Sequence, residues 1–77
     1  MARVRLFAAA EEAAGTAELS LEAESFGELR RALHAHSAEL AAILPRCAVL
    51  VDGSRVDDAE PVTGASVVDV LPPFAGG

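Results

Sequence analysis

Several residue types are absent from this sequence of 77 residues or occur only once. It contains no lysine, tryptophan or tyrosine, and its only cysteine is Cys47. One cysteine cannot form an internal disulfide or a thiolate metal cluster, which is typical of proteins in the reducing cytoplasm. No apolar run approaches the roughly 20 residues of a membrane span, and Met1 is not followed by a signal-peptide pattern. We therefore expect a cytoplasmic chain that does not enter a membrane.

Basic residues are also scarce. Lys plus Arg is 6 against 12 Asp plus Glu, so the formal net charge is −6. Binding to nucleic acid or to an anionic membrane surface requires cationic side chains, and this balance disfavours both. The hydrophobic fraction of 52% is too high for a disordered segment. A single small domain leaves little room for a full set of catalytic groups, so we expect a soluble module that acts with a partner.

The polar and apolar pattern predicts strands and helices in a definite order. Alternation or a compact apolar run predicts strands at 3–7, 16–22, 47–51 and 67–71, with a short fifth strand at 55–56 after the Asp52-Gly53 turn. An alanine-rich stretch at 8–14, closed by a glycine, predicts a short helix between the first two strands. Proline and glycine mark the remaining segments as turns.

The strongest local signal begins the main helix. Ser25 can cap the first helical turn while Glu28 reaches back to the Ser25 amide, as in a capping box. We expect this helix to end near His36, with a second short helix at 38–44 that Pro45 stops. The apolar residues at helical spacing are Phe26, Leu29, Ala32, Leu33 and Leu40.

This order of elements has a topological consequence. The first two strands can pair as a hairpin, and the main helix can then cross over so that a later strand lies parallel to the first. The result is an α+β domain with a mixed sheet of four to five strands covered by one main helix. The β-grasp, or ubiquitin-like, fold has this arrangement. We expect it to occupy residues 1–71, followed by an extended tail at 72–77.

The last six residues, 72–77, are Pro-Pro-Phe-Ala-Gly-Gly. The prolines donate no amide to a sheet and favour an extended path away from it. An end without Cβ atoms can enter a narrow channel and presents an accessible carboxylate, which adenylation can activate for transfer to sulfur or nitrogen. An inert, frayed end is the alternative, because small residues are common at chain termini.

Over its whole length the chain resembles the small subunit of molybdopterin synthase, one of the ubiquitin-like sulfur carriers. The Pro-Pro-x-x-Gly-Gly end is the most specific element of this resemblance. The other matching features are the opening segment at 4–8, the helix closed by Gly15, Leu29 and Leu33 of the main helix, the turn at 51–53, Pro61 and Gly64.

The resemblance implies a sulfur shuttle that is not catalytic alone. An E1-like adenylating enzyme would use ATP to adenylate Gly77, and a persulfide sulfur donor would convert the adenylate to a thiocarboxylate. The tail would then enter the large subunit, in a heterotetramer, where the sulfur builds the dithiolene of molybdopterin; no cofactor is bound stably. The residues implied to thread the channel are Gly76, Ala75 and Phe74. The interface candidates are Phe7, Leu71, Pro72 and Pro73, although ordinary strand-end packing also explains Leu71.

Two other functions fit the residues. The sulfur could serve thiamine, cysteine or thiolated-RNA synthesis, or the domain could be a ubiquitin-like modifier or binding module without sulfur chemistry. We expect no metal site, because His34 and His36 lie two apart on a helix and so face different directions. Cys47 begins an apolar strand, where a cysteine is usually a buried and inert small hydrophobe.

Overall fold

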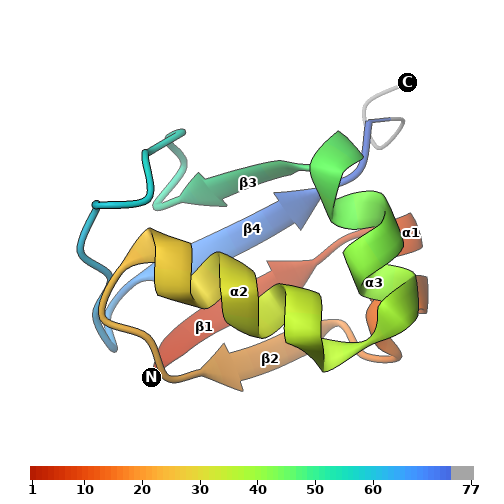
Figure 1. Cartoon of the computed structure of the whole chain (residues 1–77), viewed down its shortest axis with the longest axis horizontal. Coiled ribbons are helices and arrows are strands. Elements are labelled where there is room, and N and C mark those ends of the chain that lie inside the picture. Colours follow the sequence, from red (N-terminus) through yellow and green to blue (C-terminus); the bar gives the residue numbers. More distant parts are fainter. Residues whose placement is uncertain (74–77) are drawn as a thin grey trace.

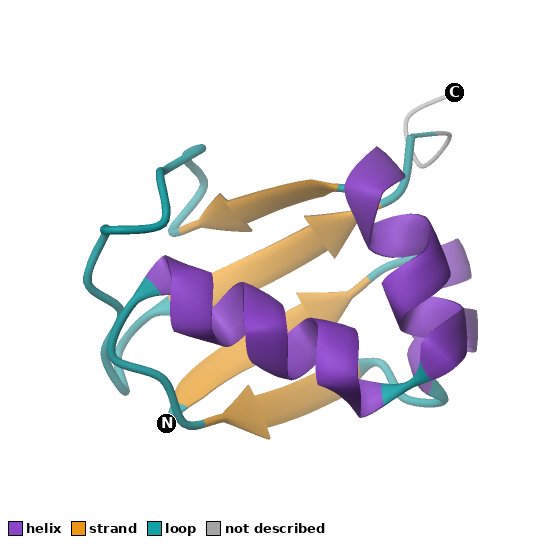
Figure 2. Ribbon diagram, viewed as in Figure 1, coloured by secondary structure: helices purple, strands orange, loops and turns teal. Residues whose placement is uncertain are grey.

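The computed structural model describes residues 1–73, which form one sheet with helices on one face and at one end (Figures 1 and 2). The sheet has four strands in the order β2-β1-β4-β3. The strands are β1 (Ala2–Leu6), β2 (Glu18–Leu21), β3 (Ala48–Val51) and β4 (Val67–Leu71). The helices are α1 (Ala9–Ala14), α2 (Phe26–His36) and α3 (Ala38–Ile43), followed by the 3-10 turn η1 (Leu44–Arg46).

The pairing of the strands follows the predicted topology. β1 pairs antiparallel with β2 and parallel with β4, and β3 pairs antiparallel with β4. The parallel pair requires a crossover, which α2 provides by running across one face of the sheet (Figure 1). The α+β, β-grasp arrangement predicted from the sequence is therefore confirmed, with β1 and β4 at the centre of the sheet.

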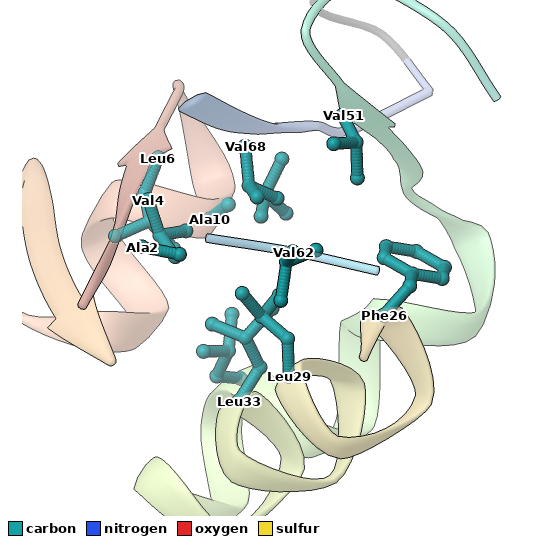
Figure 3. Close-up of a cluster of buried hydrophobic side chains, with 12 residues drawn as sticks. Ala2, Val4, Leu6, Ala10, Phe26, Leu29, Leu33, Val51, Val62 and Val68 are labelled. Carbon is teal, nitrogen blue, oxygen red and sulfur yellow. The ribbon is translucent and has the colours of Figure 1, made fainter. Parts of the chain in front are cut away.

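The core lies between the sheet and α2 (Figure 3). Side chains of β1 alternate between buried and exposed, so that Val4 and Leu6 face the helix while Arg3 and Arg5 face the opposite side. The side of the sheet that α2 does not cover is called the open face below. The fully buried large side chains are Leu29, Leu33, Leu40, Val4, Val68 and Val70.

The predicted helix start at Ser25 is confirmed, with one difference. The Ser25 hydroxyl accepts a hydrogen bond from the Glu28 amide at 3.3 Å. The Glu28 carboxylate accepts from the amide of Glu24 at 3.1 Å, one residue before the expected partner. The chain enters the helix through an isolated antiparallel bridge between Ser25 and Pro61, and the capping carboxylate stabilises a free amide at that entry.

Ser37 separates α2 from α3, so the two helices predicted from the sequence are both present. Its backbone is extended, and its hydroxyl accepts from the Leu40 amide at 3.1 Å and donates to the Ala13 carbonyl at 3.0 Å. Leu40 is fully buried and lies on α3, which agrees with the second short helix predicted at 38–44. Pro45 does not end the helical segment at once, because it lies at the start of η1. The first amides of a helical turn have no partner within that turn, so the missing amide of proline costs no hydrogen bond there.

The short strand predicted at 55–56 is wrong. Asp52 and Gly53 form the expected turn, with φ values of 49° and 83°, but only Ser54 bridges back to Val51. The chain then leaves the sheet edge because its backbone pairs with the start of α2. The amide of Gly27 donates to the carbonyl of Asp58 at 3.0 Å.

Candidate functional site

The root of the predicted tail lies at the end of β4, a central strand of the sheet. Leu71 is the last residue of β4 and is half-buried, Pro72 is buried, and Pro73 is exposed in a turn. Phe74, Ala75, Gly76 and Gly77, which carry the expected chemistry, lie outside the described residues. The sheet therefore fixes the point from which residues 72–77 depart.

Apolar side chains gather on the open face beside this root. The parallel register pairs Leu6 with Val70, and the amide of Phe7 donates to the Val70 carbonyl at 3.2 Å, which brings Phe7 beside Leu71. The antiparallel register places Ala48 opposite Leu71 on the other side. Together with Leu50, the next open-face residue of β3, they form what we call the tail-root patch: Phe7, Ala48, Leu50 and Leu71.

Phe7 is the most exposed residue of this patch. It is 38% exposed, and only Met1 among the other large hydrophobic residues is also exposed in residues 1–73. An exposed aromatic ring next to half-buried aliphatic side chains is a common feature of protein–protein interfaces. The tail-root patch therefore has the composition of a docking surface, and it adjoins the point where the tail departs.

An ion pair borders the patch on β1 and β4. Arg5 donates to both carboxylate oxygens of Asp69, with Nε–Oδ1 at 2.6 Å and Nη2–Oδ2 at 2.9 Å. These hydrogen bonds raise the pKa of Arg5. The guanidinium also lies 5.9 Å from the centre of the Phe7 ring, within the range of a cation–π contact. The ion pair thus holds the Arg5 side chain in place beside the Phe7 ring.

An open groove of about 570 Å³ also lies beside the root and shares Ala48 and Leu71 with the tail-root patch. Its lining includes Cys47, whose thiol donates to the Ile43 carbonyl at 3.3 Å. Burial raises the pKa of this thiol, which lowers the fraction present as the nucleophilic thiolate. These properties are those of a structural cysteine. The other lining residues are Pro45, Arg46, Ala48, Arg55, Leu71, Pro72 and Pro73.

The two histidines are not arranged to bind a metal ion together. His34 and His36 are both exposed on α2, and His36 Nε2 lies 3.0 Å from the carbonyl oxygen of Ala14. Within residues 1–73 there is no group of three or more His, Cys, Asp or Glu side chains placed to hold a metal ion. In the same part of the chain, no helix has the length and apolar character needed to cross a membrane.

Sequence reasoning missed part of the site. Phe7 and Leu71 were predicted as interface residues, and the register brings them together. Ala48 and Leu50 were not identified, because the run 47–51 is apolar throughout and its alternation does not reveal which face is open. Arg46 was also missed, since the pairing of β3 with β4 decides its position beside the tail root.

Comparison with known proteins gives a consistent result. The model of the ThiS family matches residues 4–77. No curated protein matches the chain. Among solved structures, the small archaeal modifier protein 1 from Methanosarcina acetivorans superposes with a TM-score of 0.82 at 24% identity, covering 99% of this chain and 95% of that one.

Two further solved structures have higher identity. The complex of subunits 1 and 2 of the molybdopterin-converting factor from Helicobacter pylori contains a chain that is 26% identical, with a TM-score of 0.76 and coverage of 99% and 97%. The HVO 2177 protein from Haloferax volcanii is 28% identical, with a TM-score of 0.74 and coverage of 99% and 85%.

Proposed function

Since the chain belongs to the ThiS family, we propose that it is a sulfur carrier that delivers sulfur as a thiocarboxylate on Gly77. We propose further that it works in the cytoplasm as the small subunit of a molybdopterin synthase. The observation that carries this proposal is the position of the tail root. The segment that leads to the two glycines departs from a central strand, directly beside a partly exposed apolar patch.

The chemistry would take place at the terminal carbonyl carbon. The Gly77 carboxylate attacks the α-phosphorus of ATP, bound by an adenylating enzyme, and pyrophosphate leaves. A persulfide sulfur of the donor then displaces AMP, and a donor thiol reduces the resulting acyl disulfide to the thiocarboxylate. Within this scheme the globular body supplies no catalytic side chain. It presents the tail and docks its partners.

The large subunit of the synthase is the proposed acceptor. The Helicobacter pylori structure is a complex of subunits 1 and 2 of the molybdopterin-converting factor, which supports a large-subunit partner for this chain. The tail-root patch would lie against the large subunit while Phe74, Ala75 and Gly76 thread toward its active site. In this proposal Phe7, Leu71, Pro72 and Pro73 form the contact around the root.

A modifier role is the second candidate, favoured by the likeness to the small archaeal modifier protein. The sequence contains no lysine, so the chain cannot build isopeptide-linked chains on its own side chains. That composition fits a carrier, whose terminus returns to a free state after each transfer, better than a chain-building modifier.

The test is intact-mass analysis after incubation with an adenylating enzyme, ATP and a persulfide donor. We expect a species in which one oxygen is replaced by sulfur. A variant lacking Gly77 should fold normally and gain no sulfur. Absence of the sulfur species from the full-length chain would refute the proposal, and stable conjugates to lysines of other proteins would favour the modifier role. Co-purification with a thiazole synthase or a cysteine-synthase-like enzyme would redirect the sulfur to another pathway.

A further inference from the structure

We propose that the outer edge of β3 is a second docking site, which binds an extended, acidic segment of a protein that acts on the tail. This inference rests on the proposed function only in assigning the partner. The site itself follows from the shape, the charge and the free backbone groups of the edge. It lies beside the tail root and adjoins the tail-root patch, with which it shares Ala48 and Leu71.

Three neighbouring hollows lie along this edge. The groove at the tail root shares Pro45, Cys47 and Arg55 with a second hollow of about 330 Å³. A third, of about 180 Å³, shares Pro45 and Val49 with the second. We call the three together the edge groove. The apolar residues along it are Phe26, Leu44, Pro45, Ala48, Val49, Val56, Leu71, Pro72 and Pro73.

The charge of this groove is opposite to that of the chain. Its lining contains Arg30, His34, Arg46 and Arg55 but no aspartate or glutamate, although the chain has 12 acidic residues and 6 arginines. Arg30 is paired with Asp58 at 2.7 Å. Arg46 and Arg55 are exposed and have no ion-pair partner within residues 1–73. Two guanidinium groups beside an apolar floor favour a ligand with carboxylates and apolar side chains.

The backbone of β3 offers hydrogen bonds to an extended chain. The Asp52 amide donates to the Val67 carbonyl at 2.8 Å, so in the antiparallel ladder Ala48 and Leu50 point their backbone groups toward β4. Val49 and Val51 therefore point theirs outward. Those of Val51 pair with Ser54, at 2.9 and 3.0 Å. The amide and carbonyl of Val49 have no backbone partner within residues 1–73 and face the groove.

These features select one kind of occupant. An extended segment could pair with the two free groups of Val49, place apolar side chains on the floor, and direct carboxylates at Arg46 and Arg55. Pairing would be confined to one residue of β3, because Ser54 blocks the edge at Val51. Most of the specificity would then come from charge, so that a basic segment would be rejected.

The experiment uses the full chain labelled with nitrogen-15 and two synthetic octapeptides, one alternating Glu with Val and one alternating Lys with Val. We expect the Glu peptide to shift the amide resonances of Cys47, Val49 and Arg55, and the Lys peptide to leave them unchanged. The double variant R46E/R55E should weaken binding of the Glu peptide about tenfold or more, and added salt should weaken it further.

The matched control is R3E/R31E, which changes the net charge equally at two arginines that do not line the groove. It should change the affinity by less than about twofold. Equal response to both peptides, shifts confined to other surfaces, no shift with either peptide, or equal losses in the two double variants would each overturn the proposal. Because this assay contains no ATP or sulfur donor, it can fail while sulfur transfer succeeds, and the reverse.

Discussion

Val70 and Leu71 are adjacent on β4 and face opposite sides of the sheet, which allows structure and function to be tested separately. Val70 is fully buried against the core, whereas Leu71 is half-buried in the tail-root patch. The substitution Val70→Ala removes two methyl groups, which costs about 1.5 kcal/mol in transfer free energy and, with the cavity, about 2–3 kcal/mol in total. A chain of this length has a free energy of unfolding of roughly 4–12 kcal/mol, so the variant should remain folded.

Leu71→Ala should have a small effect on stability and a larger effect on partner binding. The buried half of the side chain contributes roughly 1 kcal/mol to folding. The exposed half is available to a partner and is worth about as much again, which corresponds to roughly a fivefold to tenfold loss in affinity. At subsaturating concentrations of the adenylating enzyme or large subunit, the rate of sulfur loading or transfer should fall by that factor.

Thermal unfolding followed by circular dichroism measures the first effect, and intact-mass kinetics measure the second. The melting temperature of Val70→Ala should fall by about 10–20 °C, with normal transfer at temperatures where it is folded. The melting temperature of Leu71→Ala should fall by less than about 8 °C, with slowed transfer. If Leu71→Ala destabilises the fold as much as Val70→Ala and leaves transfer unchanged, then Leu71 is only a packing residue and the tail-root patch is not an interface.

Three further predictions concern the body of the domain. Ser37→Ala removes the cap of α3 and the hydrogen bond to the Ala13 carbonyl, and should lower the free energy of unfolding in urea by about 2 kcal/mol. Gly53→Ala places a side chain at a φ of 83° and should cost about 1 kcal/mol in the same assay. The hydrogen bonds from Arg30 hold the pKa of Asp58 below its usual 3.8, so this pair stabilises the folded state above that pH and is lost as the pH falls through the lowered value. Asp58→Asn should therefore lower the urea midpoint at neutral pH, and the difference from the unmodified chain should vanish once the pH falls below the lowered pKa of Asp58.

Each of these predictions has a contrary result. A loss for Ser37→Ala no larger than that of Ser25→Ala, which removes a cap only, would show that the Ala13 hydrogen bond contributes nothing. An unchanged urea midpoint for Gly53→Ala would contradict the left-handed turn. For Asp58→Asn, a difference from the unmodified chain that persists unchanged in acid would show that the charge of Asp58 is not the source of the effect.

The sequence alone predicted the fold, and it supplied the hypothesis of sulfur chemistry at Gly77. The alternation in 3–7 and 16–22 is a local signal, and so is the cap at Ser25. Each depends only on residues that are close together in the sequence. The order of the elements then admits few topologies, and the parallel pairing of β1 with β4 follows from the crossover helix. The two terminal glycines are likewise visible without any structure.

Tertiary pairing decided what local pattern could not. The run 47–51 is apolar on both sides, so only its register with β4 shows that Ala48 and Leu50 join Phe7 and Leu71 on the open face. The segment after Asp52 has the composition of a returning strand, but its backbone bonds to the start of α2 instead. The positions of Arg46 and Arg55 beside the tail root depend on both facts. Residues distant in sequence are brought together by hydrogen bonds between elements, and no spacing within one segment encodes those bonds.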